Sequence, residues 1–234
     1  MKRSLTVLAS AIPRCTRCPE LRAYCAEVAR TRRRAFADWE YWGRPVSPFG
    51  DHRARIMILG LAPAAHGGNR TGRMFTGDRS GDFLYAALHR AGLANQPTSV
   101  SRDDGLKLRG VYISAALRCA PPANKPTPRQ LDNCRPYLID ELRLLQPRAI
   151  VCLGSIAWNA ALASVNARGF ALPRPRPKFG HAAEVNIGET TLLGCYHVSQ
   201  QNTFTGRLTP AMLDGVLRRA IALSSETSRI ARHV

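Results

Sequence analysis

Four short apolar runs, separated by helix-like stretches, constrain the fold of this chain more than any other feature. The runs are Arg55–Ala62, Gly110–Leu117, Arg148–Leu153 and Thr190–Tyr196. Strands that are buried on both faces read as nearly continuous apolar runs rather than as an alternation of apolar and polar residues. We therefore predict four buried strands.

A helix is expected after each run. Ser80, Thr127 and Thr209 are suitable capping residues, and proline follows each threonine, as is common in a first helical turn. The expected helices are Ser80–Ala91, Thr127–Leu145, Ser155–Val165 and Thr209–Leu223. A repeated strand–helix alternation predicts an α/β protein, with a parallel sheet covered by helices on both faces.

The chain length of 234 residues suits a single domain, residues 1–234. Residues 22–50 are expected to form a helical and aromatic insertion before the first strand, and residues 224–234 a C-terminal tail. No apolar stretch approaches the roughly 18–20 residues that span a bilayer. The apolar run Leu5–Ile12 is too short and too polar for a signal peptide. We expect a cytoplasmic protein with no membrane partner.

The charge is strongly positive, with 34 Lys and Arg against 16 Asp and Glu, a formal net charge of +18. Nucleic acid is the first partner that such a charge indicates, because neutralised phosphates release counterions. Only four of the basic residues are lysine, so biased base composition of the coding genome is an alternative source of the arginines. The shortage of acidic residues favours nucleic acid.

Two further segments are basic. Cys18–Trp42 starts as a helix and ends in clustered arginines and aromatic residues, which is compatible with base stacking on DNA. We favour the other interpretation, that its aromatic residues dock on the sheet and its arginines are solvated. Ala167–Lys178 alternates prolines and arginines and is therefore a loop, either DNA-facing or a surface excursion.

Four of the seven cysteines lie beside prolines and helix ends. Cys15 and Cys18 form a CxxC pair before the first expected helix, Cys119 follows a strand, and Cys134 lies 15 residues later. Four thiolates bind tetrahedral zinc or a [4Fe–4S] cluster, and a redox pair or unrelated thiols are further possibilities. The remaining thiols, Cys25, Cys152 and Cys195, are expected to be buried in the core.

Two glycine- and polar-rich turns follow the first and last strands. The first reads GLAPAAHGGNRTGRMFTGD from Gly60 to Asp78, and the second reads HVSQQNTFTG from His197 to Gly206. Open α/β sheets carry their sites at such carboxyl-terminal turns. Together with the four cysteines, these turns resemble the iron–sulfur-containing family 5 (type B) of the uracil-DNA glycosylase superfamily, over Cys15 to about Leu217.

The resemblance implies a three-layer α/β/α sandwich around a central four-stranded parallel sheet. It also implies a structural [4Fe–4S] cluster on Cys15, Cys18, Cys119 and Cys134. The activity it implies is hydrolysis of the N-glycosidic bond of a damaged base in double-stranded DNA. We expect a monomer, because the sequence has no amphipathic seam that indicates an oligomer. The target base leaves the helix stack and enters a pocket.

The resemblance also implies roles for individual residues. Asp78 activates water and stabilises the sugar cation, and His197 donates a hydrogen bond to the base oxygen, where negative charge accumulates. Phe75 stacks on the base. Ala62, Ala64 and Ala65 line the water side with their backbone groups. Taken singly, Asp78 is more readily a helix cap and His197 a structural histidine, and Phe75 could be a core residue, so only the joint pattern favours the catalytic roles.

Departures from related families affect the predicted specificity. Leu61 and Ala62 stand where related families carry a carboxylate or amide, and Val198 replaces a common proline. Ala115 stands at a position commonly held by an asparagine that reads the pyrimidine edge. Ser114 or backbone groups must then supply the discrimination, which predicts a broad pocket for uracil and other deaminated bases such as hypoxanthine.

The second turn is expected to enter the minor groove. Gln200 and Gln201 are predicted to fill the vacated stack, and Arg73 and Arg207 to bind flanking phosphates. The residues predicted to contact DNA are Arg73, Ser199, Gln200, Gln201, Asn202 and Arg207.

Neither motif contains lysine, so no Schiff base with the sugar is available and the glycosylase should be monofunctional. Two alternatives remain open. One is a non-catalytic iron–sulfur nucleic-acid-binding module, and the other is a zinc-stabilised enzyme of unrelated chemistry.

Overall fold

A six-stranded sheet forms the centre of the computed structural model, which describes residues 4–225. Its spatial order is β1-β3-β2-β4-β6-β5. The strands are β1 (Phe49–Gly50), β2 (Ile56–Gly60), β3 (Val111–Ala115), β4 (Ala149–Leu153), β5 (Glu184–Ile187) and β6 (Thr190–Cys195).

The four inner strands, β3, β2, β4 and β6, are mutually parallel and correspond to the four predicted apolar runs. The short strands β1 and β5 extend the sheet antiparallel at its two edges. The sequence prediction of four strands missed both. β1 has only two residues, and β5 is partly exposed, so neither carries an apolar run.

The helices that follow the inner strands are those predicted from the sequence, with ends displaced by one or two residues. The α-helices are α1 (Leu5–Ala11), α2 (Pro19–Thr31), α3 (Gly68–Thr71), α4 (Arg79–Arg90), α5 (Pro128–Leu145), α6 (Ser155–Ala167), α7 (Gln200–Phe204) and α8 (Pro210–Ser225). Short 3-10 turns lie at Ile12–Arg14, Arg34–Phe36 and Pro122–Asn124. α1 was not expected, so the CxxC pair precedes the second helix rather than the first.

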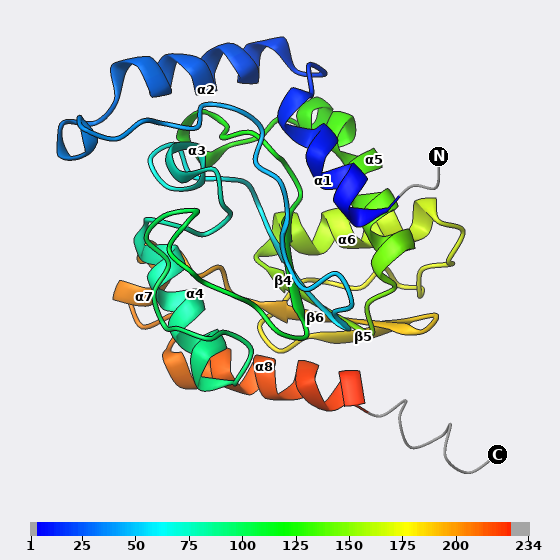
Figure 1. The fold of residues 1–234 in the computed structure, drawn as a ribbon. Helices are drawn as coiled ribbons and strands as arrows, with labels where there is room; N and C mark the ends of the chain where they lie inside the picture. The colour runs from blue at the N-terminus through cyan, green and yellow to red at the C-terminus, as the bar shows by residue number, and fades with distance from the viewer. Residues whose placement is uncertain (1–3, 226–234) are drawn as a thin grey trace.

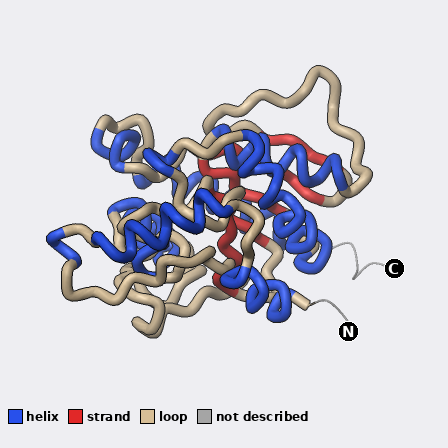
Figure 2. The backbone as a smooth tube through the Cα atoms, turned by 90° about the horizontal axis from the view of Figure 1, so that it is seen from above, coloured by secondary structure: helices blue, strands red, loops and turns tan. Residues whose placement is uncertain are grey.

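Alternate strand residues build two cores on the two faces of the sheet. Ile56 and Ile58 of β2 face α4 and α8, whereas Met57 and Leu59 face α5 and α6. Figure 1 shows α4 and α8 on one side of the sheet and α1, α5 and α6 on the other. The strands lie together between helices in the perpendicular view of Figure 2. The predicted three-layer α/β/α sandwich is confirmed, with a six-stranded mixed sheet in place of four strands.

Side-chain caps fix the starts of α4, which follows Asp78, and of α5, which carries Cys134. Asp78, not Ser80, is the N-cap of α4, and its carboxylate accepts a hydrogen bond from the Gly81 amide. Thr127 caps α5 in a capping box with Gln130. Both caps satisfy amides that the first helical turn leaves unpaired.

The segment at residues 22–50 contains most of α2, a 3-10 turn and β1. After α2, which lies at the top of Figure 1, the chain runs beside α3, with the amides of Trp42 and Gly43 donating to the carbonyls of Arg70 and Asn69. Tyr41 is buried, while Arg32, Arg33 and Arg34 are exposed. This confirms the docking interpretation, except that the aromatic residues meet α3 rather than the sheet.

No helix follows Ala167 before β5, as the prolines of the 167–178 loop predict. α8 extends to Ser225, and residues 226–234 of the predicted tail lie outside the described residues. Between residues 4 and 225, none of the helices has the length and apolar character needed to cross a membrane.

Candidate active site

The loop that follows β2 folds back on itself and places Asp78 against Gly67. A Cβ atom added to Gly67 would lie 1.9 Å from the Asp78 Oδ2 atom. The loop is held by the Ala64 carbonyl, which accepts hydrogen bonds from the amides of Gly67 and Asn69. Only glycine at position 67 therefore leaves room for the carboxylate.

Partial burial affects the pKa of Asp78. It raises the pKa of the carboxyl group, and the negative charge of Asp82 acts in the same direction. Hydrogen bonds from the amides of Gly81 and Ser80, and the charge of Arg70, oppose this shift. A carboxylate with an elevated pKa is a stronger base than an exposed one, as acid–base chemistry requires.

Phe75 lies between Asp78 and the end of β2 with a strained backbone. Its φ is +51°, in the left-handed region that side chains with a Cβ rarely adopt. Its ring reaches Gly60, where an added Cβ would lie 2.5 Å from the Phe75 Cζ atom, and its carbonyl lies so close to Gly81 that a Cβ there would be 1.9 Å away. The two glycines thus hold the ring at the edge of the sheet.

His197 follows β6 at the same sheet edge, and its ring centroid lies 6.4 Å from that of Phe75. Burial lowers the pKa of the imidazole, so the ring is neutral at neutral pH. The Asn202 side-chain amide donates to the His197 carbonyl at 2.8 Å and ties the second turn to it. The structure brings Asp78, Phe75 and His197 together, although they come from two distant segments.

The alanines of the first turn connect this site to the cysteines. Ala62 and Ala65 pack against a buried cluster around Cys18, Cys119 and Cys134, so their side chains contact the cysteine region. The backbone carbonyl of Ala64 is engaged in the loop turn.

Ala115 and Ser114 point to opposite faces of β3. Ala115 belongs to the core on the Phe75 side and pairs with Gly60 across the strands. Ser114 is fully buried, and its hydroxyl donates to the Glu141 carboxylate on α5 at 2.6 Å. The Ser114 hydroxyl therefore lies on the face away from Ala115 and is engaged by Glu141, which does not support its predicted base contact.

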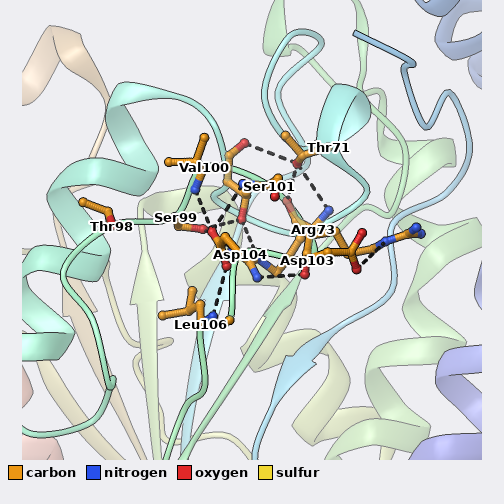
Figure 3. A network of polar contacts seen from close by, with 12 residues as sticks. Thr71, Arg73, Thr98, Ser99, Val100, Ser101, Asp103, Asp104 and Leu106 are labelled. Carbon is orange, nitrogen blue, oxygen red and sulfur yellow. Dashed lines mark hydrogen bonds and ion pairs between the residues drawn. The ribbon is translucent and has the colours of Figure 1, made fainter.

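Arg73 is also placed differently from its prediction as a phosphate contact. Its side chain is 3% exposed and its Nη2 atom lies 2.7 Å from the Asp104 carboxylate. Its other donors bind Thr76, Ser99 and the Arg102 carbonyl, as Figure 3 shows for much of this network. Arg73 thus anchors residues 98–106 to the loop that carries Phe75, with four of its five N–H groups already bonded within the protein.

The second turn forms the short helix α7, with Ser199 at its N-terminus. Gln200 and Gln201 are exposed, as a groove-inserting role requires, and Arg207 is exposed with its guanidinium over the Tyr196 ring. Phe204 is 73% exposed on α7, an unusual position for a large apolar side chain, and sequence reasoning assigned it no role.

The four predicted metal-ligating cysteines come from the segment before α2, the loop after β3 and the middle of α5. Cys18, Cys119 and Cys134 lie in one buried cluster, and Cys15 is close enough to Cys134 to influence its pKa. Within residues 4–225, no three His, Cys, Asp or Glu side chains are arranged to hold a single metal ion. Cys25, Cys152 and Cys195 are buried, as predicted.

Burial raises the pKa of Cys134, so this thiol is protonated in the absence of a bound group. The Asn133 side chain donates to the Cys18 Sγ atom at 3.3 Å. The backbone amide and the positive charge of Arg118 both lower the pKa of Cys134, against the larger effect of burial. Four cysteines, three of them in one apolar cluster, are the ligand type and number that a [4Fe–4S] cluster requires.

Comparison with known proteins places this arrangement in a family. Residues 47–220 match the model of the uracil DNA glycosylase superfamily. The chain is 55% identical over 224 residues to a type-5 uracil-DNA glycosylase of Mycobacterium bovis, covering 94% of this chain and 82% of the relative. It is 52% identical over 212 residues to that of Thermus thermophilus, covering 90% and 94%, and 50% identical over 208 residues to that of Pyrobaculum aerophilum, covering 89% and 88%. The chain therefore belongs to the uracil DNA glycosylase superfamily and, within it, to the type-5 family.

Proposed function

We propose that the protein is a monofunctional DNA glycosylase that removes uracil and other deaminated bases, such as hypoxanthine, from double-stranded DNA. One observation carries this proposal: the carboxylate of the half-buried Asp78 lies against Gly67, at the same sheet edge as Phe75 and His197. The names of the type-5 relatives support uracil as a substrate.

Asp78 acts at the sugar, where positive charge develops during the reaction. As the C1′–N bond breaks, its electron pair leaves with the base and positive charge develops on the deoxyribose. An ionised Asp78 stabilises that charge and accepts a proton from the water that attacks C1′. Leu61 and Ala62 have no ionisable side chain for this step, so Asp78 performs it.

His197 and Phe75 act on the base. A neutral imidazole donates its N–H to the base oxygen, where negative charge grows in the transition state. Phe75 provides the stacking face for the flipped base. The nearest lysines in sequence, Lys107 and Lys178, lie outside both turns, so the product is an uncut abasic site.

The broad substrate range follows from Ala115. Its methyl group offers no hydrogen bond to the base edge, and Ser114 is turned away, so backbone groups remain for recognition. An Ala115→Asn variant should narrow or shift the ratio of uracil to hypoxanthine excision. An unchanged ratio would contradict this assignment.

Cys15, Cys18, Cys119 and Cys134 would hold a [4Fe–4S] cluster, which supplies a cross-link between three chain segments. The packing of Ala62 and Ala65 on the cysteine region connects that cross-link to the loop before Asp78. Visible absorbance, together with iron and acid-labile sulfide assays, tests the cluster. Colourless protein containing one zinc would favour the zinc-stabilised alternative.

DNA is engaged by α7 and its flanks. The exposed Gln200 and Gln201 fill the vacated stack, Ser199 and Asn202 support them, and Arg207 meets a flanking phosphate. The protein acts as a monomer in the cytoplasm, associated with the nucleoid of a prokaryote.

The test of the proposed activity uses end-labelled duplexes with one U·G, one hypoxanthine·T or one normal C·G pair. Each is incubated with the protein and then divided for treatment with or without hot alkali. Alkali-dependent cleavage at the modified base only is the expected result. A coloured, folded protein that binds these duplexes without cutting any of them would support the non-catalytic binding module.

A further inference from the structure

A polar pocket of about 240 Å³ lies between residues 39–44 and residues 101–103, beside the candidate active site. Arg44, Arg70 and Arg102 line it, together with Trp42. Glu40 and Asp103 contribute two carboxylates, so guanidinium groups outnumber carboxylates at this pocket.

The most unusual of these groups is Arg70, which is 2% exposed. Its guanidinium lies over the rings of Phe36 and Trp39, at 3.9 and 4.1 Å from their centroids. It donates to the carbonyls of His66 and Gly77, but its Nη1 atom has no acceptor among the described residues.

Comparison with Arg73, three residues later, shows what Arg70 lacks. Arg73 is equally buried, but it forms an ion pair with Asp104. Arg70 has no carboxylate within ion-pair distance in residues 4–225, although it feels the more distant charge of Asp78. A buried cation without a close counter-ion is costly, and an anionic ligand would reduce that cost.

The other two arginines of the pocket, Arg44 and Arg102, both stack on the indole ring of Trp42. The guanidinium carbon atoms of Arg44 and Arg102 lie 4.1 and 4.9 Å from the centroid of the Trp42 ring. Stacking leaves the N–H edges of a guanidinium available to phosphate oxygens. Arg102 contacts Asp103 only at 3.7 Å, and the Asp103 side chain is 83% exposed.

We propose that this pocket binds a backbone phosphate of the damaged DNA strand, close to the flipped nucleotide. The location follows from Arg70, whose Nη2 atom donates to the carbonyl of Gly77, the residue before Asp78. The proposal rests on the proposed glycosylase function for its choice of strand. It gives the aromatic segment after α2 a role in holding the DNA backbone.

The experiment measures binding to a duplex with an inert abasic-site analogue, by fluorescence anisotropy at several salt concentrations. Arg44→Gln and Arg102→Gln should each weaken binding severalfold and reduce the slope of log K against log salt by about 1. Asp103→Asn should tighten binding. Arg168→Gln is the matched control, because Arg168 also stacks on an aromatic ring, Phe170, but lies at the opposite end of α6 from the site.

A second measurement identifies the phosphate. Neutral methylphosphonates replace one phosphate at a time beside the lesion. At one position the replacement should weaken the binding of the wild-type protein and of Arg168→Gln, but not of the Arg44→Gln, Arg102→Gln double variant. Circular dichroism confirms that each variant is folded.

The outcomes separate this inference from the proposed function. If the wild-type protein excises uracil but the salt slopes and methylphosphonate effects of the double variant equal those of the wild type, the phosphate site is wrong. If the variants lose phosphate contacts as expected but the wild-type protein excises no base, the site stands and the proposed activity fails.

Discussion

At the scale of the single residue, Asp78 combines two functions that substitution can separate. It caps α4 through the Gly81 amide, and it holds the carboxylate assigned to the reaction. Asparagine caps helices as well as aspartate does, but it carries no charge and accepts no proton. Asp78→Asn should therefore slow excision on the order of 100-fold or more while shifting the melting temperature by no more than about 2 °C.

The complementary variant is Asp78→Ala, which loses the cap as well. It should be as inactive as Asp78→Asn and also melt about 2–4 °C lower, because an N-cap contributes about 1 kcal/mol. Single-turnover excision and thermal melts provide both readouts. An active Asp78→Asn protein would reduce Asp78 to a helix cap.

Gly67 tests the position of the same carboxylate without changing its charge. A methyl group at Gly67 would collide with Oδ2 of Asp78, so Gly67→Ala should displace the carboxylate and cost about 100-fold in single-turnover rate. Gly180→Ala is the control, because its added methyl meets only ordinary contact, 3.7 Å from the Ala183 Cβ atom. Equal activity of the two variants would show that the carboxylate does not need this position.

The pH dependence of excision follows from Asp78 and His197 together. Burial raises the pKa of Asp78 above its ordinary 3.8 and lowers the pKa of His197 below its ordinary 6.5. The reaction needs ionised Asp78 and neutral His197, which are the high-pH forms of both groups. The single-turnover rate should therefore rise with pH. In a plot of rate against pH, this rising limb should start above pH 3.8. His197→Gln should remove only the His197 part of that limb, and a rate that falls as pH rises through this range would contradict the assignment.

Sequence reasoning located the residues of the site better than their surroundings. Asp78, Phe75 and His197 converge because parallel strands deliver their following turns to one edge. Arg73 and Ser114 could not be placed, because their partners, Asp104 and Glu141, lie 31 and 27 residues away in the chain. A pattern within one turn does not show such a partner.

At the scale of the element, the predictable parts were those with a strong local pattern. The inner strands are continuous apolar runs. The start of α5 is marked in the sequence by its capping-box residues, and its end by the proline that follows the helix. β1 and α3 have two and four residues, too few for any period to show. Their formation depends on pairing with β3 and on the glycine-rich loop, which are tertiary contacts.

The cysteine region ties together elements that otherwise make few contacts, so its loss should be local. Cys18→Ser should abolish binding of the proposed [4Fe–4S] cluster and lower hydrogen-exchange protection in residues 15–31 and 119–134, while β2 and β4 stay protected. Cys152→Ala is the control, because it removes a buried thiol from β4, away from the cysteine cluster. Unchanged protection in residues 15–31 after loss of iron would show that no cross-link operates there.

At the scale of the whole molecule, the sheet separates two cores, and the candidate site lies between the core that Phe75 packs against and the cysteine region. The net charge of +18 gives general attraction to DNA, whereas the pocket at Arg44 and Arg102 adds local contacts beside the reacting bond. Composition alone indicated DNA as the partner. It did not show which surface binds DNA, because most arginines are scattered through the sequence.

Stability of the whole fold should depend on one buried ion pair between β3 and α5. Arg118 and Glu141 lie 2.7 Å apart and are 1% and 0% exposed. Arg118→Met leaves a buried carboxylate with only Ser114 as its donor, at a cost of about 3–5 kcal/mol, or about 10 °C in melting temperature. Arg90→Met, which breaks the exposed pair with Asp214, should change stability by less than about 1 kcal/mol.

The double variant Arg118→Met, Glu141→Leu decides whether the pair is stabilising in itself. The Nε and Nη1 atoms of Arg118 and the Oε1 atom of Glu141 have no partner among residues 4–225, so the pair recovers only part of its desolvation cost. The double variant should therefore regain most of the lost melting temperature. Iron content must be measured in parallel, because Arg118 precedes Cys119 and its charge lowers the pKa of Cys134. A double variant that keeps its iron but melts as low as Arg118→Met would show that the pair, with its unpaired atoms, is favourable to the fold.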